Sequence, residues 1–278
     1  DVRKLEYAYS WYDFAQAAKN DHYYDPASGT YKGGFVINAE GEKEAIKGRS
    51  SFIMKKKVKV YPDTLCWLKD LTYAYNEPFV REYFSHIGYD NYPVVGVNWH
   101  QAQAFCNWRT QYFNSNAGVR VQAWRLPNEV EWEYAARGGL SGAKYPWGGP
   151  YTRNKKGCFL ANFKPLRGNY ISDGGFTTVP VGTHEPNGFG LYDMAGNVAE
   201  WTGDAFDESA YQVTHDLSPY YQITAKKSDN KILKRKVIRG GSWKDIAYFM
   251  QCGVRTYEYA DSARSFIGFR TVRTRIEY

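Results

Sequence analysis

The chain has 278 residues, with 36 Lys and Arg against 29 Asp and Glu, which gives a formal net charge of +7. Hydrophobic residues make up 43% of it and charged residues 23%, a balance that excludes disordered and collagen-like chains. No apolar run approaches the roughly 18–20 residues of a membrane-spanning helix. The first residues contain neither a leader peptide nor a lipid-attachment cysteine, so we expect a mature or trimmed fragment.

Aromatic residues are unusually frequent. The chain contains 9 Trp, 25 Tyr and 15 Phe, together 18% of its residues, and 26 Gly. Rings bury a large area with few rotatable bonds, so this composition favours an irregular, glycine-rich backbone over stacked helices. The four cysteines are far apart and form no C-x-x-C pair, which argues against a zinc site or a thioredoxin-like redox motif.

Two clusters carry most of the surplus positive charge, at 55–59 and at 226–239. Basic clusters attract nucleic acids, but the sequence has no helix-turn-helix, zinc-finger or RNA-recognition pattern beside them. We therefore interpret both clusters as solvated charge on loops and strand edges, and we expect no nucleic-acid partner.

The first hundred residues predict few regular elements. Apolar spacing within 2–19 predicts a short helix, and turn residues dominate much of 20–60. The β-branched segment 92–97 predicts a short buried strand. Asn98 then begins a helix, because Gln101 at the third helical position completes a capping box.

A second capping box, formed by Asn128 and Glu131, begins another helix, and Gly138 is a suitable left-handed stop. The segment 145–201 is so rich in Gly, Asn, Asp, Pro and aromatic residues that it predicts ordered loops with short strands. The polar segment 204–235 predicts a surface insertion. Two strand-like segments follow, at 237–243 and 268–273.

Several glycine- and tryptophan-rich motifs follow one another in a fixed order between residues 93 and 270. They are Pro93-Val94-Val95-Gly96-Val97, Ala102 to Trp108, Arg125-Leu126-Pro127 with Glu131-Trp132-Glu133, Tyr145-Pro146-Trp147-Gly148, Asn187 to Trp201, Arg239-Gly240-Gly241-Ser242-Trp243 and Gly268-Phe269-Arg270. This series resembles the formylglycine-generating enzyme (sulfatase-modifying factor) family, and the likeness covers about residues 60–278.

The resemblance implies an α+β fold, an elaborated C-type-lectin-like architecture with little regular secondary structure and many ordered loops. It implies a single domain over 1–278, with insertions at about 20–60 and 204–235. The strand pair that opens this fold is expected to be missing or to lie upstream of Asp1, and 1–20 is expected to be the helix that follows it.

A second set of segments narrows the likeness. These segments are Tyr61-Pro62-Asp63-Thr64-Leu65, Asn76-Glu77-Pro78, Asn162 to Tyr170 and Lys234-Arg235-Lys236-Val237. They resemble the GldK (PorK) family of lipoproteins of the type IX secretion and gliding-motility machinery. The likeness implies a non-catalytic structural subunit of a periplasmic ring, attached to the outer membrane through an N-terminal lipidated cysteine that this chain does not contain.

The same resemblance implies partners: a GldN/PorN-like ring subunit and further copies of the chain, with other gliding lipoproteins and peptidoglycan as further candidates. The basic stretch 226–239 and the aromatic flank 211–221 are the surface we expect to meet a neighbouring subunit. The alternatives are a GldJ-like lipoprotein, or a ligand-binding or enzymatic member of the formylglycine-generating enzyme family.

Catalysis is not expected. The family's oxidases hold copper with two cysteines after the Gly-Gly-Ser motif, and Asp245 and Met250 stand at those positions here. The five histidines share no ligand spacing, so we expect no three-histidine iron site and assign no catalytic residue. The resemblance also implies that the two disulfides of the enzymes are absent, because each retains only one cysteine. Cys106 would pair with position 271, which is Thr271, and Cys252 would pair with position 136, which is Ala136.

The resemblance also implies structural Ca²⁺ at two sites, since the matching oxygen donors are retained. Calcium takes six to eight oxygen ligands, often including turn carbonyls. We expect metal above all at the second site, because two buried carboxylates without a cation are costly; the simpler interpretation is that these side chains bond the loop backbone. The first site comprises Asn162, Asp173 and the carbonyls of Phe163 and Gly175; the second comprises Asp193, Glu200 and the carbonyls of Gly196 and Val198.

Overall fold

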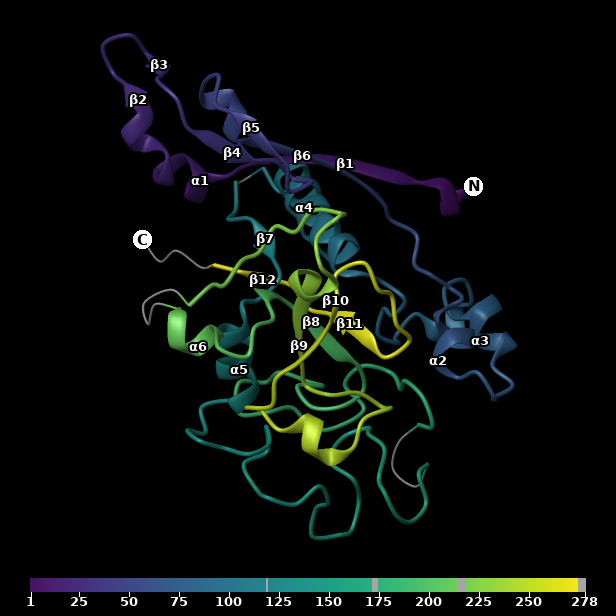
Figure 1. Ribbon diagram of the computed structural model, residues 1–278. Coiled ribbons are helices and arrows are strands. Elements are labelled where there is room, and N and C mark those ends of the chain that lie inside the picture. Colours follow the sequence, from purple (N-terminus) through teal and green to yellow (C-terminus); the bar gives the residue numbers. More distant parts are fainter. Residues whose placement is uncertain (119, 172–174, 215–218, 275–278) are drawn as a thin grey trace.

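A small curled sheet lies at the centre of the molecule (Figure 1). The computed structural model describes residues 1–118, 120–171, 175–214 and 219–274. The sheet has the strand order β10-β9-β8-β11, in which β11 runs parallel to β8 and the other neighbours are antiparallel. Its strands are β8 (Ala199–Ala205), β9 (Arg235–Arg239), β10 (Thr256–Tyr259) and β11 (Ile267–Phe269).

Both predicted capping boxes are confirmed. The helix α4 (Trp99–Asn116) begins at Asn98, and α5 (Glu129–Arg137) begins at Asn128 and ends at Gly138 with φ 57°. Ala102 and Cys106 of α4 pack with Trp201 and Ile267 of the sheet, and Trp132 and Ala136 of α5 pack with Met194 and Cys252. The short strands β7 (Trp124–Arg125) and β12 (Val272–Arg273) pair beside these helices.

The helix predicted within 2–19 is wrong for most of its length. A single 3₁₀ turn (Val2–Lys4) precedes the strand β1 (Glu6–Tyr12), and only α1 (Phe14–Lys19) is helical. Alternation at every second residue decides the outcome: the rings of Tyr7, Tyr9 and Trp11 stack along one face of β1, with centroids 5.7 and 5.6 Å apart. The helix expected over 1–20 is therefore a strand followed by a short helix in this structure.

Residues 20–60 are more ordered than an insertion of turns. Two hairpins, β2 (Tyr24–Asp25) with β3 (Thr30–Tyr31) and β4 (Phe35–Ile37) with β5 (Lys43–Ala45), precede β6 (Ile53–Lys59). The last strand pairs antiparallel with β1 to form a ribbon above α4 (Figure 1). A small core of Val36, Ile46, Phe52 and Met54 supports this subdomain.

The predicted strand at 92–97 does not form, although Val95 and Val97 are buried as expected. Gly96 has φ 67° and breaks the extended run; its N–H donates to the carbonyl of Arg264 and its own carbonyl accepts from Asp63. The neighbouring helices α2 (Cys66–Asp70) and α3 (Glu77–Glu82) enclose an aromatic cluster around Trp67, Tyr83 and Trp243.

Long ordered loops occupy most of 145–198, as predicted, and the only bridge between extended residues described there joins Arg153 and Phe159. The segment 204–235 contains α6 (Ala210–Val213) and a 3₁₀ turn (Lys231–Lys234). Within the described residues, no helix is long and apolar enough to cross a lipid bilayer.

The prediction that the basic stretch 226–239 is solvated is wrong at its end. Lys236 and Arg239 belong to the central strand β9 and are only 4% and 1% exposed. The buried residues Val237 and Ile238 lie between the two cations in the same strand. Packing of this strand in the core therefore buries charges that composition alone predicts to be at the surface.

We predict that Asn128→Ala lowers the free energy of unfolding by about 1 kcal/mol, because the side chain that accepts from the Glu131 N–H at 2.8 Å is lost. Urea denaturation followed by circular dichroism measures the change. Asn128→Asp retains the acceptor and should stay within a few tenths of wild type; equal losses in both variants would contradict the capping role.

Candidate functional site

The turn that carries the predicted metal residues has an unusual backbone. Asp193, Gly196 and Asn197 have φ of 54°, 77° and 61°, so three residues in five are left-handed. The turn is fixed from both sides: Gly196 N–H donates to the Gly240 carbonyl at 2.9 Å, and Asn197 N–H donates to the Asn162 carbonyl at 2.8 Å. The two predicted calcium sites therefore adjoin one another through Asn162.

Glu200, at the start of β8, is 5% exposed and fully engaged by side chains. Arg270 binds it in a bidentate ion pair, with Nε–Oε2 of 2.5 Å and Nη2–Oε1 of 2.6 Å, and Trp132 Nε1 donates to Oε2 at 2.7 Å. The buried carboxylate thus has a cation supplied by the chain. The charge argument that called for metal beside Glu200 does not hold in this arrangement, because Arg270 already compensates the carboxylate.

Asp193 lies nearby without such a partner in the described chain. Burial raises the pKa of its carboxyl, and its Oδ2 accepts one hydrogen bond, from the Gly182 N–H at 2.9 Å. No described residue donates a hydrogen bond to the carbonyl oxygens of Gly196 or Val198. Carboxylate and carbonyl oxygens without donors suit a hard cation, so Asp193, Gly196 and Val198 fit Ca²⁺ better than Glu200 does.

Three of the four residues of the first predicted calcium site lie within the described part of the chain. Asn162 is 2% exposed, and its Nδ2 donates to the Thr177 carbonyl at 2.7 Å, which leaves Oδ1 as an acceptor. Phe163 is buried in the neighbouring core, and Gly175 packs tightly against Val179. Asp173 lies outside the described residues. Among the residues that are described, no group of three or more His, Cys, Asp or Glu side chains is arranged to hold a metal.

Asp245 and Met250, which the resemblance places at the positions of the copper-binding cysteines, make ordinary structural contacts. Ser242, which has no exposed surface, donates to Asp245 Oδ2 at 2.6 Å, and burial raises the pKa of that carboxyl. Met250 is also fully buried and packs with Tyr145 and Phe163. Asp245 is thus a hydrogen-bonded acid, and Met250 is a residue of the hydrophobic core.

All four cysteines are free thiols in the structure. Burial raises the pKa of Cys66 and Cys106 to about 12 and that of Cys252 to about 11, which disfavours the reactive thiolate. Cys252 lies in one buried cluster with Ala136, the residue that the resemblance places opposite it. Thr271 accepts a hydrogen bond from Arg109 at 2.6 Å.

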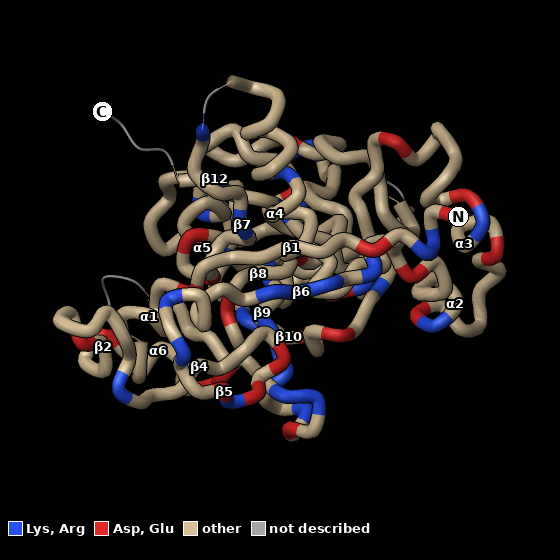
Figure 2. The backbone as a smooth tube through the Cα atoms, turned by 90° about the horizontal axis from the view of Figure 1, so that it is seen from above, with Lys and Arg blue, Asp and Glu red and all other residues tan. Residues whose placement is uncertain are grey.

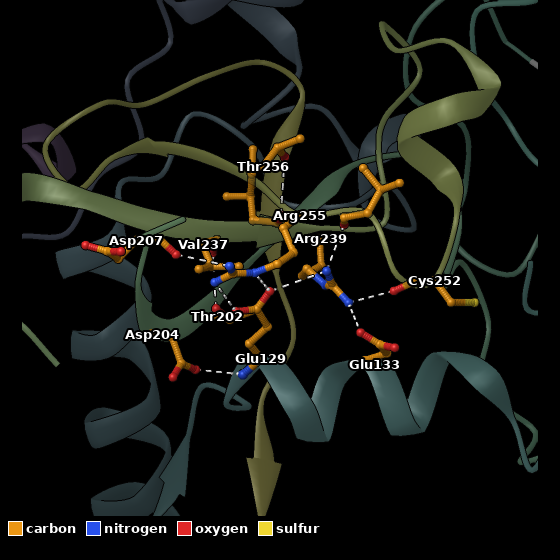
Figure 3. A network of polar contacts seen from close by, with 12 residues as sticks. Glu129, Glu133, Thr202, Asp204, Asp207, Val237, Arg239, Cys252, Arg255 and Thr256 are labelled. Atoms are coloured by element: carbon orange, nitrogen blue, oxygen red, sulfur yellow. Dashed lines mark hydrogen bonds and ion pairs between the residues drawn. The ribbon is translucent and has the colours of Figure 1, made fainter. Parts of the chain in front are cut away.

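A buried charge network under the sheet escaped the sequence analysis (Figure 3). Arg239, with 0% side-chain exposure, contacts Glu129 at 3.3 Å and Glu133 at 2.5 Å, and Arg255 binds Glu129 at 2.6 and 2.8 Å. Arg239 also donates to the Cys252 carbonyl at 2.6 Å and the Val254 carbonyl at 2.9 Å. Its place between an apolar strand pair and the Gly240-Gly241 turn is the signal that marks it as internal.

Comparison with known proteins agrees with this architecture. The sulfatase-modifying factor enzyme 1-like domain family matches residues 30–275, so the chain belongs to this family. The fold is shared with PvdO from Pseudomonas aeruginosa, whose structure superposes with a TM-score of 0.52 and 27% identity over 66% of this chain and 62% of that protein.

Relatives include both enzymes and inactive proteins. A formylglycine-generating enzyme from Streptomyces coelicolor is 35% identical over 189 residues, covering 66% of this chain and 53% of that enzyme. The inactive Cα-formylglycine-generating enzyme 2 of Bos taurus is 35% identical over 185 residues, covering 64% and 49%. The chain thus spans about half the length of these relatives.

We predict that Gly196→Ala destabilises the fold by about 3 kcal/mol or more, because a Cβ there would lie 2.4 Å from the Asn162 carbonyl oxygen. Gly190→Ala is the matched control: its φ of 74° is nearly the same, and nothing lies within 4 Å of the added carbon. It should cost only the backbone strain, about 1 kcal/mol. Thermal and urea unfolding compare the two, and equal losses would show that the contact with Asn162 is unimportant.

Proposed function

We propose that this chain is a non-catalytic, structural member of the sulfatase-modifying factor family. The observation that carries the proposal is the replacement of the copper-binding thiols by Asp245, held by Ser242, and by the buried Met250. Soft thiolates select copper(I), and a carboxylate with a thioether does not reproduce that pair. The existence of inactive relatives is compatible with this proposal.

The more specific proposal is a subunit of the type IX secretion and gliding-motility machinery, of the GldK (PorK) kind. Its support is the set of segments that resemble that family, notably 61–65 and 162–170. On this proposal the chain lies at the periplasmic face of the outer membrane, lipid-anchored, and assembles into a ring with a GldN/PorN-like subunit and further copies of itself. A GldJ-like lipoprotein is the nearest alternative.

On this proposal, the surface that meets the partner is the 3₁₀ turn Lys231–Lys234 and not the whole basic stretch 226–239. The 3₁₀ turn Lys231–Lys234 exposes Ile232 by 53% and Leu233 by 39% beside the exposed Lys231, whereas Lys236 and Arg239 are internal. An apolar pair rimmed by charge is the composition of a protein interface.

We predict that the double variant Lys231→Glu with Ile232→Asp reduces capture of a purified GldN/PorN-like subunit at least tenfold, because both the apolar contact and the charge are lost. Pull-down at low and moderate salt measures it. Lys155→Glu, an exposed lysine in another loop, supplies the matched charge control and should behave as wild type. Undiminished capture by the double variant would exclude this turn as the contact.

Calcium is proposed as a structural ion of the 193–198 turn. Asp193 and the carbonyls of Gly196 and Val198 would hold it, and it would neutralise an acid whose burial is otherwise unfavourable. The ion would bind the folded chain alone, so it would stabilise that state by mass action.

We predict that millimolar Ca²⁺ raises the melting temperature and that a chelator lowers it. Asp193→Asn should remove most of the response, since it removes the charge without changing the size of the side chain. Differential scanning fluorimetry with elemental analysis provides the test, and Glu208→Gln, in the polar insertion, is the control. Identical melting curves in chelator and in calcium, with no bound metal, would refute the ion.

An enzymatic role is the second candidate, because several relatives are formylglycine-generating enzymes. Oxygen consumption by the copper(I)-treated chain in the presence of a cysteine-containing peptide would favour it and would overturn the non-catalytic proposal.

A further inference from the structure

A cleft of about 600 Å³ is lined by none of the residues of the 193–198 turn and by neither Asp245 nor Met250. Its walls are the inner face of the β1–β6 ribbon, the tip of the β4–β5 hairpin, the start of α4 and the segment 220–236. The two insertions thus meet around it: the backbone of Lys226 closely approaches Gly41, and Lys226 Nζ pairs with Glu42 at 3.1 Å.

Lys236 is the unusual group in this cleft. It is 4% exposed, and its Nζ lies 4.2 Å above the ring of Trp99. No described carboxylate is within ion-pairing distance of it. Asp204 is the acid whose charge acts on it most, but Asp204 accepts from the N–H groups of Glu129 and Tyr221. Burying an ammonium group without a paired anion costs free energy, and an anionic ligand bound in the cleft would reduce that cost.

A second ammonium group faces the same space. Lys56 Nζ lies 2.8 Å from His100 Nδ1, and His100 Nε2 lies 3.3 Å from Asp261. Burial lowers the pKa of His100, so the neutral ring accepts from Lys56 through Nδ1 and donates from Nε2 to Asp261. His100 thereby orients the ammonium of Lys56 without neutralising it. Six lysines and three acids line the cleft, and two of these lysines, Lys57 and Lys226, are ion-paired with Glu6 and Glu42. Figure 2 shows the basic run along β6.

One wall offers main-chain groups as well. Residues 222–225 belong to no helix, strand or turn, and their exposure alternates from one residue to the next, as it does along a strand. Gln222 anchors this run by donating to the Gly203 carbonyl at 2.7 Å. No described backbone group bonds to the N–H or C=O groups of 222–225. Such a run can accept an added strand, since an extended peptide forms main-chain hydrogen bonds with an open edge.

We propose that this cleft binds an acidic peptide segment in extended form, with a carboxylate between Lys56 and Lys236 and main-chain bonds along 222–225. The stacked rings of Tyr9 and Trp11, which line the opposite wall, would cover the neighbouring side chains of the peptide. The proposal does not depend on a role in a secretion ring. A peptide is favoured over an acidic glycan because a glycan has no backbone to pair with 222–225.

The test uses the whole 278-residue chain and a fluorescein-labelled peptide, Thr-Val-Tyr-Asp-Val-Thr-Tyr, capped at both ends. Fluorescence anisotropy should give binding that weakens at least tenfold when its Asp is replaced by Asn. Lys236→Met should weaken binding at least tenfold while leaving the melting temperature unchanged or higher, because it removes an unpaired buried charge. Lys55→Met, on the outward face of β6, is the matched control and should bind as wild type.

Two further peptides carry N-methyl groups at the odd or at the even residues. Only the one whose methylated N–H groups would bond to 222–225 should lose affinity, whereas simple charge attraction would leave both unchanged. Equal binding of the Asp and Asn peptides, unchanged binding by Lys236→Met, or no binding at all would overturn the proposal. Preferential binding of muropeptide sugars bearing carboxylates, with no affinity for the free peptide, would equally overturn it in favour of a glycan site.

Discussion

The central sheet is joined to its flanking helix by a guanidinium group that has no contact with solvent. Arg239 bonds two acids of α5 and two carbonyls of the segment 252–254, so one side chain fixes three parts of the chain that are distant in sequence (Figure 3). Removing one member of such a network leaves an uncompensated buried charge, a loss of about 3–5 kcal/mol in comparable cases. The charges therefore specify how α5 sits against β9, which an apolar contact alone would fix less narrowly.

Buried asparagines perform the same task in the loops. Asn187 donates to the carbonyls of Ala135 and Ala136 at the end of α5, and Asn197 exchanges hydrogen bonds with the backbone of Val179 on both sides of its amide. These amides satisfy backbone groups that in other folds are paired within a sheet. The long segment between α5 and β8 can thus be ordered with very little regular secondary structure, because its hydrogen bonds are made by side chains.

The sequence predicted the features that depend on neighbours along the chain and missed those that depend on distant ones. Both capping boxes are local, since four residues contain donor and acceptor, and both were found. The first strand was mistaken for a helix because its partner, β6, lies 40 residues away and its aromatic rings suit either period. The cleft was invisible for the same reason: Lys56, His100 and Lys236 meet only after two insertions fold against each other. At the turn 193–198 the residues were identified by resemblance, but the pairing of Glu200 with Arg270 is apparent only in the three-dimensional structure.

Ala136 and Thr271 occupy the positions where the resemblance implies the second cysteine of each disulfide. Ala136 packs in one buried cluster with Cys252, and Thr271, which the resemblance places opposite Cys106, accepts a hydrogen bond from Arg109. Packing and polar contacts thus stand in place of covalent links, and burial raises the pKa of Cys106 and of Cys252, which disfavours the thiolate that exchange requires. A bridge between residues 106 and 271, or between residues 136 and 252, cannot form in this chain, so the stability of these two regions rests on non-covalent contacts alone.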